Sequence, residues 1–403
     1  EPHRYSIYAA RLDEIADRHG VIFVNSAGNL SQQEARAPWH EKPGEVVKYF
    51  ANRTQPDTIM KPAESVRSIS DGALNPPGTT HLVDAPTTYT RRGPGLQVGV
   101  KPDIAMYGGA GVGVGENSGL KSVDADGNLV NLTGTSYAAP LVARTLAGID
   151  TATRGSLSTE ALKAMLLHTA ETPYPLTRRG IKGRLDRQFA GFGRPTNSGL
   201  MLETGDHEIT LVFQSRLTVG ERRPAILRFP FSWPASLVDS ATGACSGSAK
   251  LTLVYSPPLD PAFGAEFVRV NLDAALRQRS DGSRKDGQPS YLDRISPKYL
   301  PNAKDLGIPE RALINHGLKW WPSKQYESNF NSKGTSSEWR LEVSSLVRAE
   351  SNFPTEGVPF AVILTLKDTE AVRPIFQEMR QSLQASAANA VDIRTAARVR
   401  PRS

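Results

Sequence analysis

Hydrophobic positions follow two different patterns along the chain, and the change comes near residue 200. Before it, segments with apolar residues at helical spacing alternate with short, continuous apolar runs. After it, apolar and polar residues alternate one by one over several short segments. The first pattern is typical of helices packed on a parallel sheet, and the second of antiparallel strands with one buried face.

The first part of the chain, residues 1–200, is expected to form a doubly wound α/β domain. Residues 5–19 carry apolar side chains at helical spacing, and Gly20 ends the predicted helix. Val21–Val24 follows as a strand that we expect to be buried on both faces. The other expected elements are a short helix at Gly44–Ala51, strands at Ser65–Leu74 and Asp103–Met106, and a helix at Thr159–Ala170. The rest of residues 30–62 is a polar connection that either shapes a functional cleft or is a surface insertion.

The second part predicts an antiparallel β-sandwich of jelly-roll type over residues 201–368. Its alternating runs are Ile209–Phe213, Val268–Leu272, Trp339–Val343 and Phe360–Leu366. Residues 277–300 are polar and contain Asp-Gly twice, which predicts a mobile loop. Residues 369–403 are expected to form a short helix, to about residue 385, and then a basic, disordered tail.

Composition and charge narrow the function classes. Of the 403 residues 39% are hydrophobic, yet no apolar run approaches the about 18 residues of a membrane span, so we expect no membrane partner. The single Cys245 excludes an internal disulfide framework and a cysteine-based metal site, and it favours a cytoplasmic location over secretion. The net charge of +7 is scattered without interleaved aromatics, which argues against a nucleic-acid surface. Gly108–Gly119 holds six glycines without a phosphate-binding spacing, and we expect neither a cofactor nor a metal.

The segment Gly134-Thr135-Ser136 is the first candidate for chemistry. A glycine turn delivers a serine to the start of an apolar, small-residue helix, where unpaired backbone N–H groups can stabilise a developing negative charge. The simpler interpretation is an ordinary helix N-cap, since serine and threonine are favoured there. The chain contains the same tripeptide at Gly334–Ser336, followed by a strand pattern, and there it is typical of a turn.

What distinguishes Ser136 from Ser336 is the segment Val21–Asn29. Its apolar run ends in small residues and an asparagine, and the C-terminal ends of parallel strands are where open α/β sheets bind ligands. The Asn29 amide would supply a neutral hydrogen-bond donor for a carbonyl oxygen. Alone, Ala27-Gly28-Asn29 is typical of a turn, but together with the Ser136 segment it is far more specific.

These segments resemble the subtilisin-like serine protease family (subtilases). Four matches occur in the family's order: Phe23–Asn29, Lys101–Ala105, Gly134–Pro140 and Gly191–Arg194. The resemblance implies that residues 1–200 are the C-terminal part of a subtilisin-like doubly wound parallel sheet, and a β-rich domain after it is common in the family. It also implies a serine endopeptidase with Ser136 as nucleophile and Asn29 in the oxyanion hole, acting on a peptide or protein substrate. The residues expected to bind substrate are Ser26, Ala27, Gly28, Gly134 and Thr135.

The chain departs from the family in one informative respect. The subtilisin triad follows the order Asp, His, Ser, and in this family both partners precede the oxyanion asparagine. Residues 1–28 are too few to hold two further strands and a helix. We therefore expect an upstream N-terminal segment to carry the Asp and His, and this chain alone to be nearly inert. Of the seven histidines, His40 and His81 lie in predicted loops without family-like context, and His168 is expected to be structural.

Two other families of serine hydrolases and one non-catalytic function are alternatives to this interpretation. Sedolisins use a similar serine motif but place an aspartate where Asn29 stands. The α/β-hydrolase elbow needs a glycine where this chain has Ala138. A non-catalytic binding or assembly module on a protease scaffold is the alternative that stays open, because the other two triad residues are missing.

Overall fold

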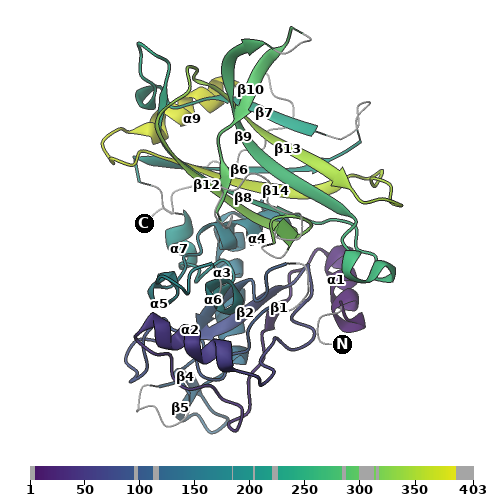
Figure 1. The fold of residues 1–403 in the computed structure, drawn as a ribbon, viewed down its shortest axis with the longest axis vertical. Helices are drawn as coiled ribbons and strands as arrows, with labels where there is room; N and C mark the ends of the chain where they lie inside the picture. Colours follow the sequence, from purple (N-terminus) through teal and green to yellow (C-terminus); the bar gives the residue numbers. More distant parts are fainter. Residues whose placement is uncertain are drawn as a thin grey trace.

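The computed structural model describes residues 5–94, 99–111, 118–183, 185–202, 205–219, 226–283, 287–298, 313–314 and 317–386. A parallel sheet with its helices forms one part of the molecule, and two antiparallel sheets form the other (Figure 1). The two parts follow each other in sequence, and they meet where α4 (Thr159–His168) packs on the antiparallel strands β8 (Cys245–Tyr255) and β14 (Val358–Lys367).

The parallel sheet has the order β1-β2-β3. Its strands are β1 at Val24–Ser26, β2 at Ile69–Leu74 and β3 at Ile104–Tyr107. Helix α1 (Ile7–His19) leads into β1; the Ser6 hydroxyl caps its start, and Gly20, at a φ of +63°, ends it. Parallel pairing brings the C-terminal ends of the three strands to one edge, where ligands bind in such sheets.

Helices cover both faces of this sheet. On one face, Val142, Leu146 and Ile149 of α3 (Thr135–Ala152) pack with buried Ile69 and Ile104. On the other face, residues of α2 (Pro43–Asn52), α5 (Tyr174–Thr177) and α6 (Leu185–Ala190) pack around Leu74 and Ala105. The predicted helices at 44–51 and 159–170 are confirmed as α2 and α4.

The prediction that Val21–Val24 form a strand buried on both faces was wrong in the bounds of the strand and in its burial. The strand begins at Val24 and continues to Ser26, and its three residues are all half-buried. Val21 is 42% exposed because it directly follows the end of α1. Among the described residues β1 pairs only with β2, so one of its edges carries no neighbouring strand.

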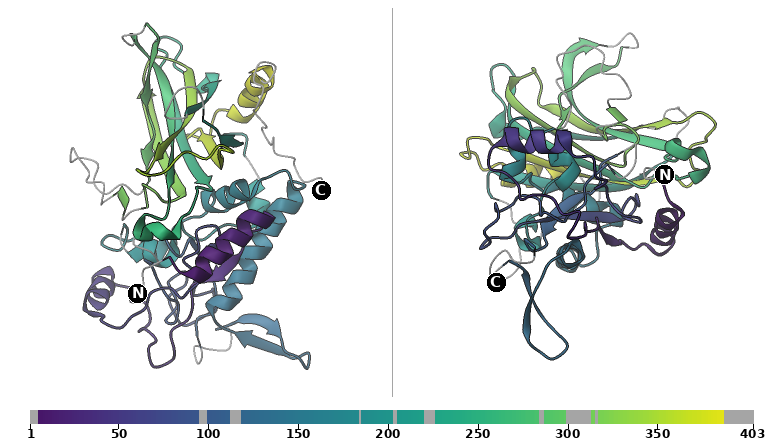
Figure 2. Two further views of the ribbon diagram at one scale, coloured as in Figure 1. Left: turned by 90° about the vertical axis from the view of Figure 1, so that its right-hand side faces the viewer. Right: turned by 60° about the horizontal axis from the view of Figure 1, so that its bottom comes forward.

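A two-stranded hairpin precedes α3 and had no counterpart in the sequence prediction. Strands β4 (Leu120–Val123) and β5 (Leu129–Leu132) pair antiparallel, and their turn projects away from the rest of the molecule (Figure 2). Its side chains are half-buried or exposed, including Val123 and Leu129. The hairpin passes directly into Thr133 and the glycine turn before Ser136.

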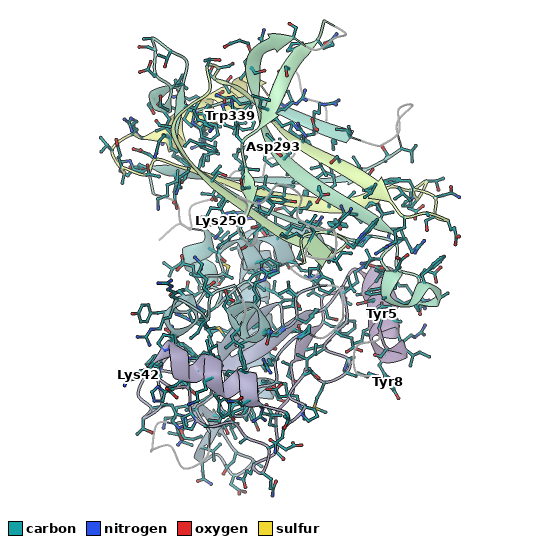
Figure 3. All side chains as sticks on the ribbon, viewed as in Figure 1. Tyr5, Tyr8, Lys42, Lys250, Asp293 and Trp339 are labelled. Carbon is teal, nitrogen blue, oxygen red and sulfur yellow. The ribbon has the colours of Figure 1, made fainter. Side chains whose placement is uncertain are left out.

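The second part contains two antiparallel sheets with the orders β10-β9-β13-β7 and β11-β12-β8-β14-β6. Side chains from both sheets, with Trp339 among them, join one hydrophobic cluster (Figure 3). Helix α9 (Ile375–Ser386) adds Ile375 and Met379 to this cluster. The strands are β6 at Glu208–Leu217, β7 at Ile226–Ser232, β8 at Cys245–Tyr255, β9 at Val270–Ser283, β10 at Pro289–Asp293, β11 at Ser296–Pro297, β12 at Ser323–Lys333, β13 at Glu338–Val347 and β14 at Val358–Lys367.

The mobile loop predicted at residues 277–300 is contradicted where the structure describes this segment. Strand β9 continues to Ser283 and pairs with β10 and β13. Its polar side chains have partners on β13: Arg279 lies 2.7 Å from Glu338, and Arg277 lies 3.2 Å from Glu342. Opposite charges across strands stabilise a sheet without any hydrophobic alternation, so the hydropathy pattern could not reveal these strands.

The turn at Gly334–Ser336 and a helix near the C-terminus were also predicted from the sequence. Gly334–Ser336 forms the turn between β12 and β13, as predicted. The predicted helix at 369–385 is present as α9, but it begins at Ile375, and the predicted disordered tail lies outside the described residues from 387 onward. In the described ranges, no helix has the length and apolar character needed to cross a bilayer.

Candidate functional site

Ser136 lies in the first turn of α3, with Gly134 as the residue before the helix. Gly134 adopts a φ of 151° and a ψ of 154°, a conformation that only glycine adopts readily. Its N–H donates to the Gly108 carbonyl at 2.8 Å, which ties the turn to the glycine segment after β3. Ser136 is exposed, and among the described residues no hydrogen bond engages its hydroxyl. The Ser136 hydroxyl is therefore accessible to a ligand.

The Asn29 side chain reaches the same turn from the end of β1. Its Oδ1 accepts hydrogen bonds from the Thr135 N–H and the Thr135 hydroxyl, both at 3.0 Å. A Cβ added at Gly134 would lie 3.2 Å from Asn29 Nδ2, so the amide nitrogen faces the turn. Because Oδ1 is occupied, the two Nδ2 protons are the part of the amide left to donate to a ligand. Two segments separated by 106 residues thus meet beside Ser136.

The residues expected to bind substrate differ in accessibility. Ser26 and Gly28 are half-buried, and Gly28 has a φ of +97° where a Cβ would lie 2.7 Å from Met60 Cγ. Ala27 is fully buried against Ile59 and Ala63, and its N–H donates to the Asp71 carbonyl at 2.8 Å. Gly134 is buried. Thr135 is also fully buried, with its hydroxyl and N–H both bound to Asn29.

Asp71 is a residue of this region that the sequence interpretation missed. It pairs with Ser26 in the parallel register of β1 and β2, so the two side chains lie side by side on the same face. Its carboxyl group is fully buried, and neither oxygen has a hydrogen-bond partner among the described residues. Burial raises the pKa of Asp71 well above its ordinary value. The sequence carries no clear signal for this acid, because residues 65–74 include several other polar side chains.

Replacing Asp71 with asparagine is expected to stabilise the fold in a pH-dependent way. Above the ordinary aspartate pKa of about 3.9, the unfolded chain loses the proton that the buried carboxyl retains. The free energy of unfolding of the native protein therefore falls, by at most about 1.4 kcal/mol per pH unit, until the raised folded pKa is passed. Asp71→Asn removes this loss, so its advantage should be larger at pH 7 than at pH 4.

Urea unfolding of both proteins at the two pH values measures this difference. Asp126→Asn is the matched control, because Asp126 is exposed in the turn of the β4–β5 hairpin. An Asp71→Asn advantage that is equal at pH 4 and pH 7 would show that folding does not raise the pKa of this carboxyl.

Tyr89 links Asp71 to the turn before Ser136. Its hydroxyl lies 2.6 Å from the Gly108 carbonyl and 2.7 Å from the Gly109 carbonyl. Burial, with a further contribution from Asp71, raises the pKa of Tyr89, so the phenol keeps its proton and remains a donor. Glycine at position 108 allows this close approach, because a Cβ there would lie 2.9 Å from the Tyr89 hydroxyl oxygen.

The two other segments that resemble the family, Lys101–Ala105 and Gly191–Arg194, are in contact with each other. Lys101 Nζ donates to Asp103 Oδ2 at 2.5 Å, and this buried carboxylate also accepts from the Ser70 N–H. Phe192 N–H donates to the Asp103 carbonyl at 2.7 Å, and a Cβ at Gly191 would lie 2.2 Å from that same oxygen. These contacts hold β2, the start of β3 and the chain after α6 together. The two segments therefore stabilise the sheet that carries the site.

None of the described histidines is hydrogen-bonded to Ser136. His168 is buried, with Nδ1 2.9 Å from the Thr252 hydroxyl and Nε2 2.8 Å from the Thr365 hydroxyl, which confirms its structural role. Burial holds the pKa of His168 well below its ordinary value. His3 and His316 lie outside the described residues.

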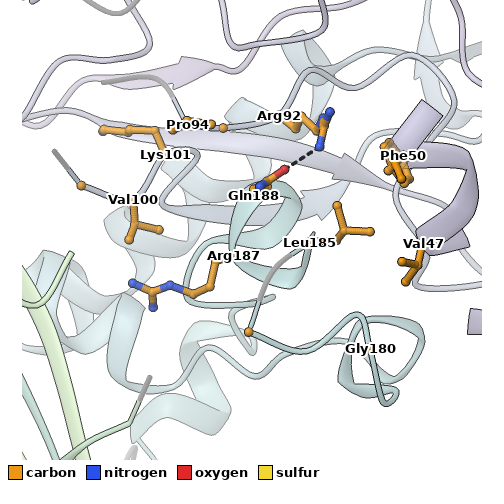
Figure 4. Close-up of a pocket in the computed structure, with 14 residues that line it drawn as sticks. Val47, Phe50, Arg92, Pro94, Val100, Lys101, Gly180, Leu185, Arg187 and Gln188 are labelled. Carbon is orange, nitrogen blue, oxygen red and sulfur yellow. Dashed lines mark hydrogen bonds between the residues drawn. The ribbon is translucent and has the colours of Figure 1, made fainter. Parts of the chain in front are cut away.

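Two cavities lie on the α2 side of the sheet. One, of about 440 Å³, is lined by residues of α2 and α6 and by Arg92, whose Nη1 donates to Gln188 Oε1 at 2.5 Å (Figure 4). The other, of about 560 Å³, is lined by α2 and by the segments around Arg36 and Thr87. Neither Ser136 nor Asn29 lines either of them.

Comparisons with known proteins agree with the resemblance seen in the sequence. Residues 1–193 match the model of the Subtilase family. Over 434 aligned residues the chain is 24% identical to the uncharacterized protein y4bN of Sinorhizobium fredii, with 94% of this chain and 91% of that protein covered.

Two solved structures are also similar to this chain. The patellamide maturation protease PatA is 16% identical with a TM-score of 0.33, and the match covers 50% of this chain and 58% of PatA. The MycP3 protease from the type VII (ESX-3) secretion system is 22% identical with a TM-score of 0.29, and the match covers 49% of this chain and 48% of MycP3. The chain thus spans less than two thirds of either structure.

Proposed function

Residues 1–193 belong to the subtilase family, and from this premise we propose that the protein is a subtilisin-type serine endopeptidase. Ser136 is the nucleophile and Asn29 is the oxyanion donor. The observation that carries the proposal is the pair of 3.0 Å hydrogen bonds from Thr135 to Asn29 Oδ1, which hold the amide beside an exposed serine. A serine with no structural bond, next to an amide with free donors, suits acyl transfer.

The proposed reaction follows from these positions. Ser136 Oγ attacks the carbonyl carbon of a peptide bond while its proton passes to a histidine, and the carbonyl oxygen becomes an oxyanion. Asn29 Nδ2 and the Ser136 N–H donate to this oxyanion, since no hydrogen bond among the described residues engages that N–H. Collapse of the intermediate releases the amine with the proton from the histidine, and water then hydrolyses the acyl-enzyme.

We assign Thr135 as a positioning residue and not as a substrate contact, because it is buried and both of its donors are bound to Asn29. Ser26 and Gly28 are proposed to form one wall of the pocket for the residue before the scissile bond. Ala27 and Gly134 contribute backbone to this wall, since both are buried. Substrate is proposed to bind as an added extended strand.

The histidine and aspartate of the triad are proposed to come from a segment upstream of Glu1. The edge of β1 that has no neighbour among the described residues is a place where further parallel strands can pair. The domain division is likewise proposed: residues 1–200 as the catalytic part and residues 201–368 as a β-sandwich. The cluster shared by the two antiparallel sheets supports the latter.

Labelling with a fluorophosphonate probe, which reacts with activated serines, tests this function. In subtilisin, removal of the histidine lowers turnover about 2 × 10⁶-fold. Residues 1–403 alone should therefore label almost undetectably, and the upstream segment, fused or added as a fragment, should produce strong labelling at Ser136. Strong labelling of the isolated chain would refute the missing-base argument. No labelling of the complete protein would favour a non-catalytic binding or assembly module.

A further inference from the structure

The cavity of about 560 Å³ beside α2 has the size of a ligand site, and charged side chains lie among the apolar and aromatic residues that line it. Two buried arginines, Arg36 and Arg53, lie on its wall with Trp39 and Tyr49. Lys48 and His40 also line it, and Glu45 is the one acidic residue among its described lining residues. The cavity therefore combines aromatic surface with an excess of positive charge.

Three arginines of this cluster share a single buried carboxylate, that of Asp57. It lies 3.0 Å from Arg36 Nη1, 3.3 Å from Arg53 Nε and 2.9 Å from Arg92 Nε. The side chains of Asp57, Arg36 and Arg53 are only 4%, 2% and 7% exposed. Burial lowers the pKa of Arg36 to about 10; Asp57 opposes this shift, and the neighbouring arginines add to it. Buried charge without enough opposite charge is costly.

Two aromatic rings and one side-chain amide stabilise the positive charges of the arginines only in part. Arg36 stacks 4.7 Å above the centre of the Phe189 ring, and Arg92 stacks 4.9 Å above the centre of the Phe50 ring. Arg92 also donates to Gln188 and faces the neighbouring cavity (Figure 4). Arg53 has no stacked ring among the described residues, and besides its ion pair with Asp57 it interacts only at longer range with the exposed Glu34 carboxylate.

Arg36 and Arg53 also retain unused donors. Arg53 donates from Nη1 to the Tyr49 hydroxyl at 3.0 Å and from Nη2 to the Glu34 carbonyl at 2.9 Å, and its Nε lies 3.3 Å from Asp57 Oδ2. Arg36 donates to Asp57, Thr87 and Thr90. Each guanidinium carries five N–H donors, so both groups keep capacity for an acceptor that enters the cavity. A carboxylate matches this planar fork in charge and in shape.

The backbone places the cavity close to the Ser136 site. Asn29 forms a β-bridge with Thr90, and Thr87 lines the cavity. Thr87 lies three residues before Thr90, and three residues of chain span at most about 11 Å. A substrate peptide bound in extended form would cover this distance with about three residues. The stretch from Leu30 to Arg36 follows the same path, with Leu30 N–H bound to the Tyr89 carbonyl and Arg36 N–H bound to the Thr88 carbonyl.

We propose that this cavity is a substrate subsite for a peptide carboxylate, which Arg36 and Arg53 bind about two to four residues from the scissile bond. The inference rests on the proposed protease function, which it extends to a class of substrates. The carboxylate belongs either to an acidic side chain or to the C-terminus of a short peptide. Both sources present the same group, and the experiment distinguishes them.

The test measures kcat/KM of the complete protein for a series of peptides. One arm moves a single glutamate through each position within four residues of the cleaved bond, and each peptide has a glutamine twin. The other arm compares free and amidated C-termini on short peptides. At one position, or at the free C-terminus, the charged form should be preferred at least about 10-fold, as expected for a charged hydrogen bond. Preferences all within two-fold would overturn the proposal.

Variants connect the preference to the cavity. Arg53→Gln should reduce the preference for the charged form to near one, and Arg53→Lys, which keeps the charge, should retain part of it. Lys42→Gln is the matched control, because Lys42 is exposed just before α2 and does not line the cavity. A preference unchanged in Arg53→Gln, in protein whose thermal unfolding shows it to be folded, would contradict the assignment.

A binding measurement separates this proposal from the protease proposal. Calorimetric titration of the Ser136→Ala protein with each charged peptide of the series and its neutral twin does not require catalysis. If no peptide is hydrolysed by the native protein, the protease function fails, while tighter binding of the charged peptide still supports the subsite. Equal binding of the two peptides would reject it.

Discussion

Ser136→Ala is expected to lower peptide hydrolysis by the complete protein about 10⁶-fold, the scale of the loss when the subtilisin serine is removed. The hydroxyl makes no hydrogen bond among the described residues and is exposed, so its loss should leave the fold intact. The measurement is kcat on a peptide substrate, with the thermal unfolding midpoint as a check on folding.

The chain supplies its own control for this variant. Ser336 ends the same Gly-Thr-Ser tripeptide, but it lies in the turn between β12 and β13, where its hydroxyl accepts from the Glu338 N–H at 3.1 Å. Ser336→Ala should keep hydrolysis within two-fold of the native rate. Equal losses in both variants would show that the effect of Ser136 is structural.

Asn29→Ala is expected to lower kcat about 10²–10³-fold while KM changes little, because the donor acts on the oxyanion and not on the bound substrate. The same substitution also removes the acceptor of the two Thr135 hydrogen bonds. Asn29→Asp separates the two contributions: it keeps an oxygen for Thr135 and replaces the donor with a negative charge. We expect Asn29→Asp to lose at least as much activity as Asn29→Ala.

Thr135→Val completes this comparison. It removes the hydroxyl bond to Asn29 Oδ1 and keeps the backbone bond, so the loss in kcat should be smaller than in either Asn29 variant. Recovery of most activity in Asn29→Asp would mean that the side chain positions the turn and donates nothing to the oxyanion.

The sequence predicts the meeting of Asn29 and Ser136 because both follow recognisable local patterns. Asn29 ends an apolar run, and Ser136 begins a helix after a glycine. Parallel strands bring their C-terminal ends to one edge, and the structure has Asn29 in contact with Thr135 there. Even so, the strand before Asn29 begins at Val24 rather than Val21, since hydropathy alone does not separate the connection at residues 21–23 from the strand that follows it.

Other features depend on partners far along the chain, which a single sequence does not indicate. Asp71 looks like an ordinary polar residue in a strand, and only its position between β1 and β3 leaves its carboxyl without a partner. Arg36, Asp57 and Arg92 are widely spaced, and the fold alone assembles their charges. The strands within residues 277–300 escaped prediction for the same reason, because their stabilising charges lie on β13.

The central claim is that the Ser136 hydroxyl and the Asn29 amide act on one reacting oxygen. A crystal structure of the complete protein after reaction with a fluorophosphonate measures this directly, because the phosphonyl oxygen takes the place of the oxyanion. We predict a covalent bond to Ser136 Oγ and a phosphonyl oxygen about 2.7–3.1 Å from both Asn29 Nδ2 and the Ser136 nitrogen. An adduct on another residue, or a phosphonyl oxygen turned away from Asn29, would contradict it.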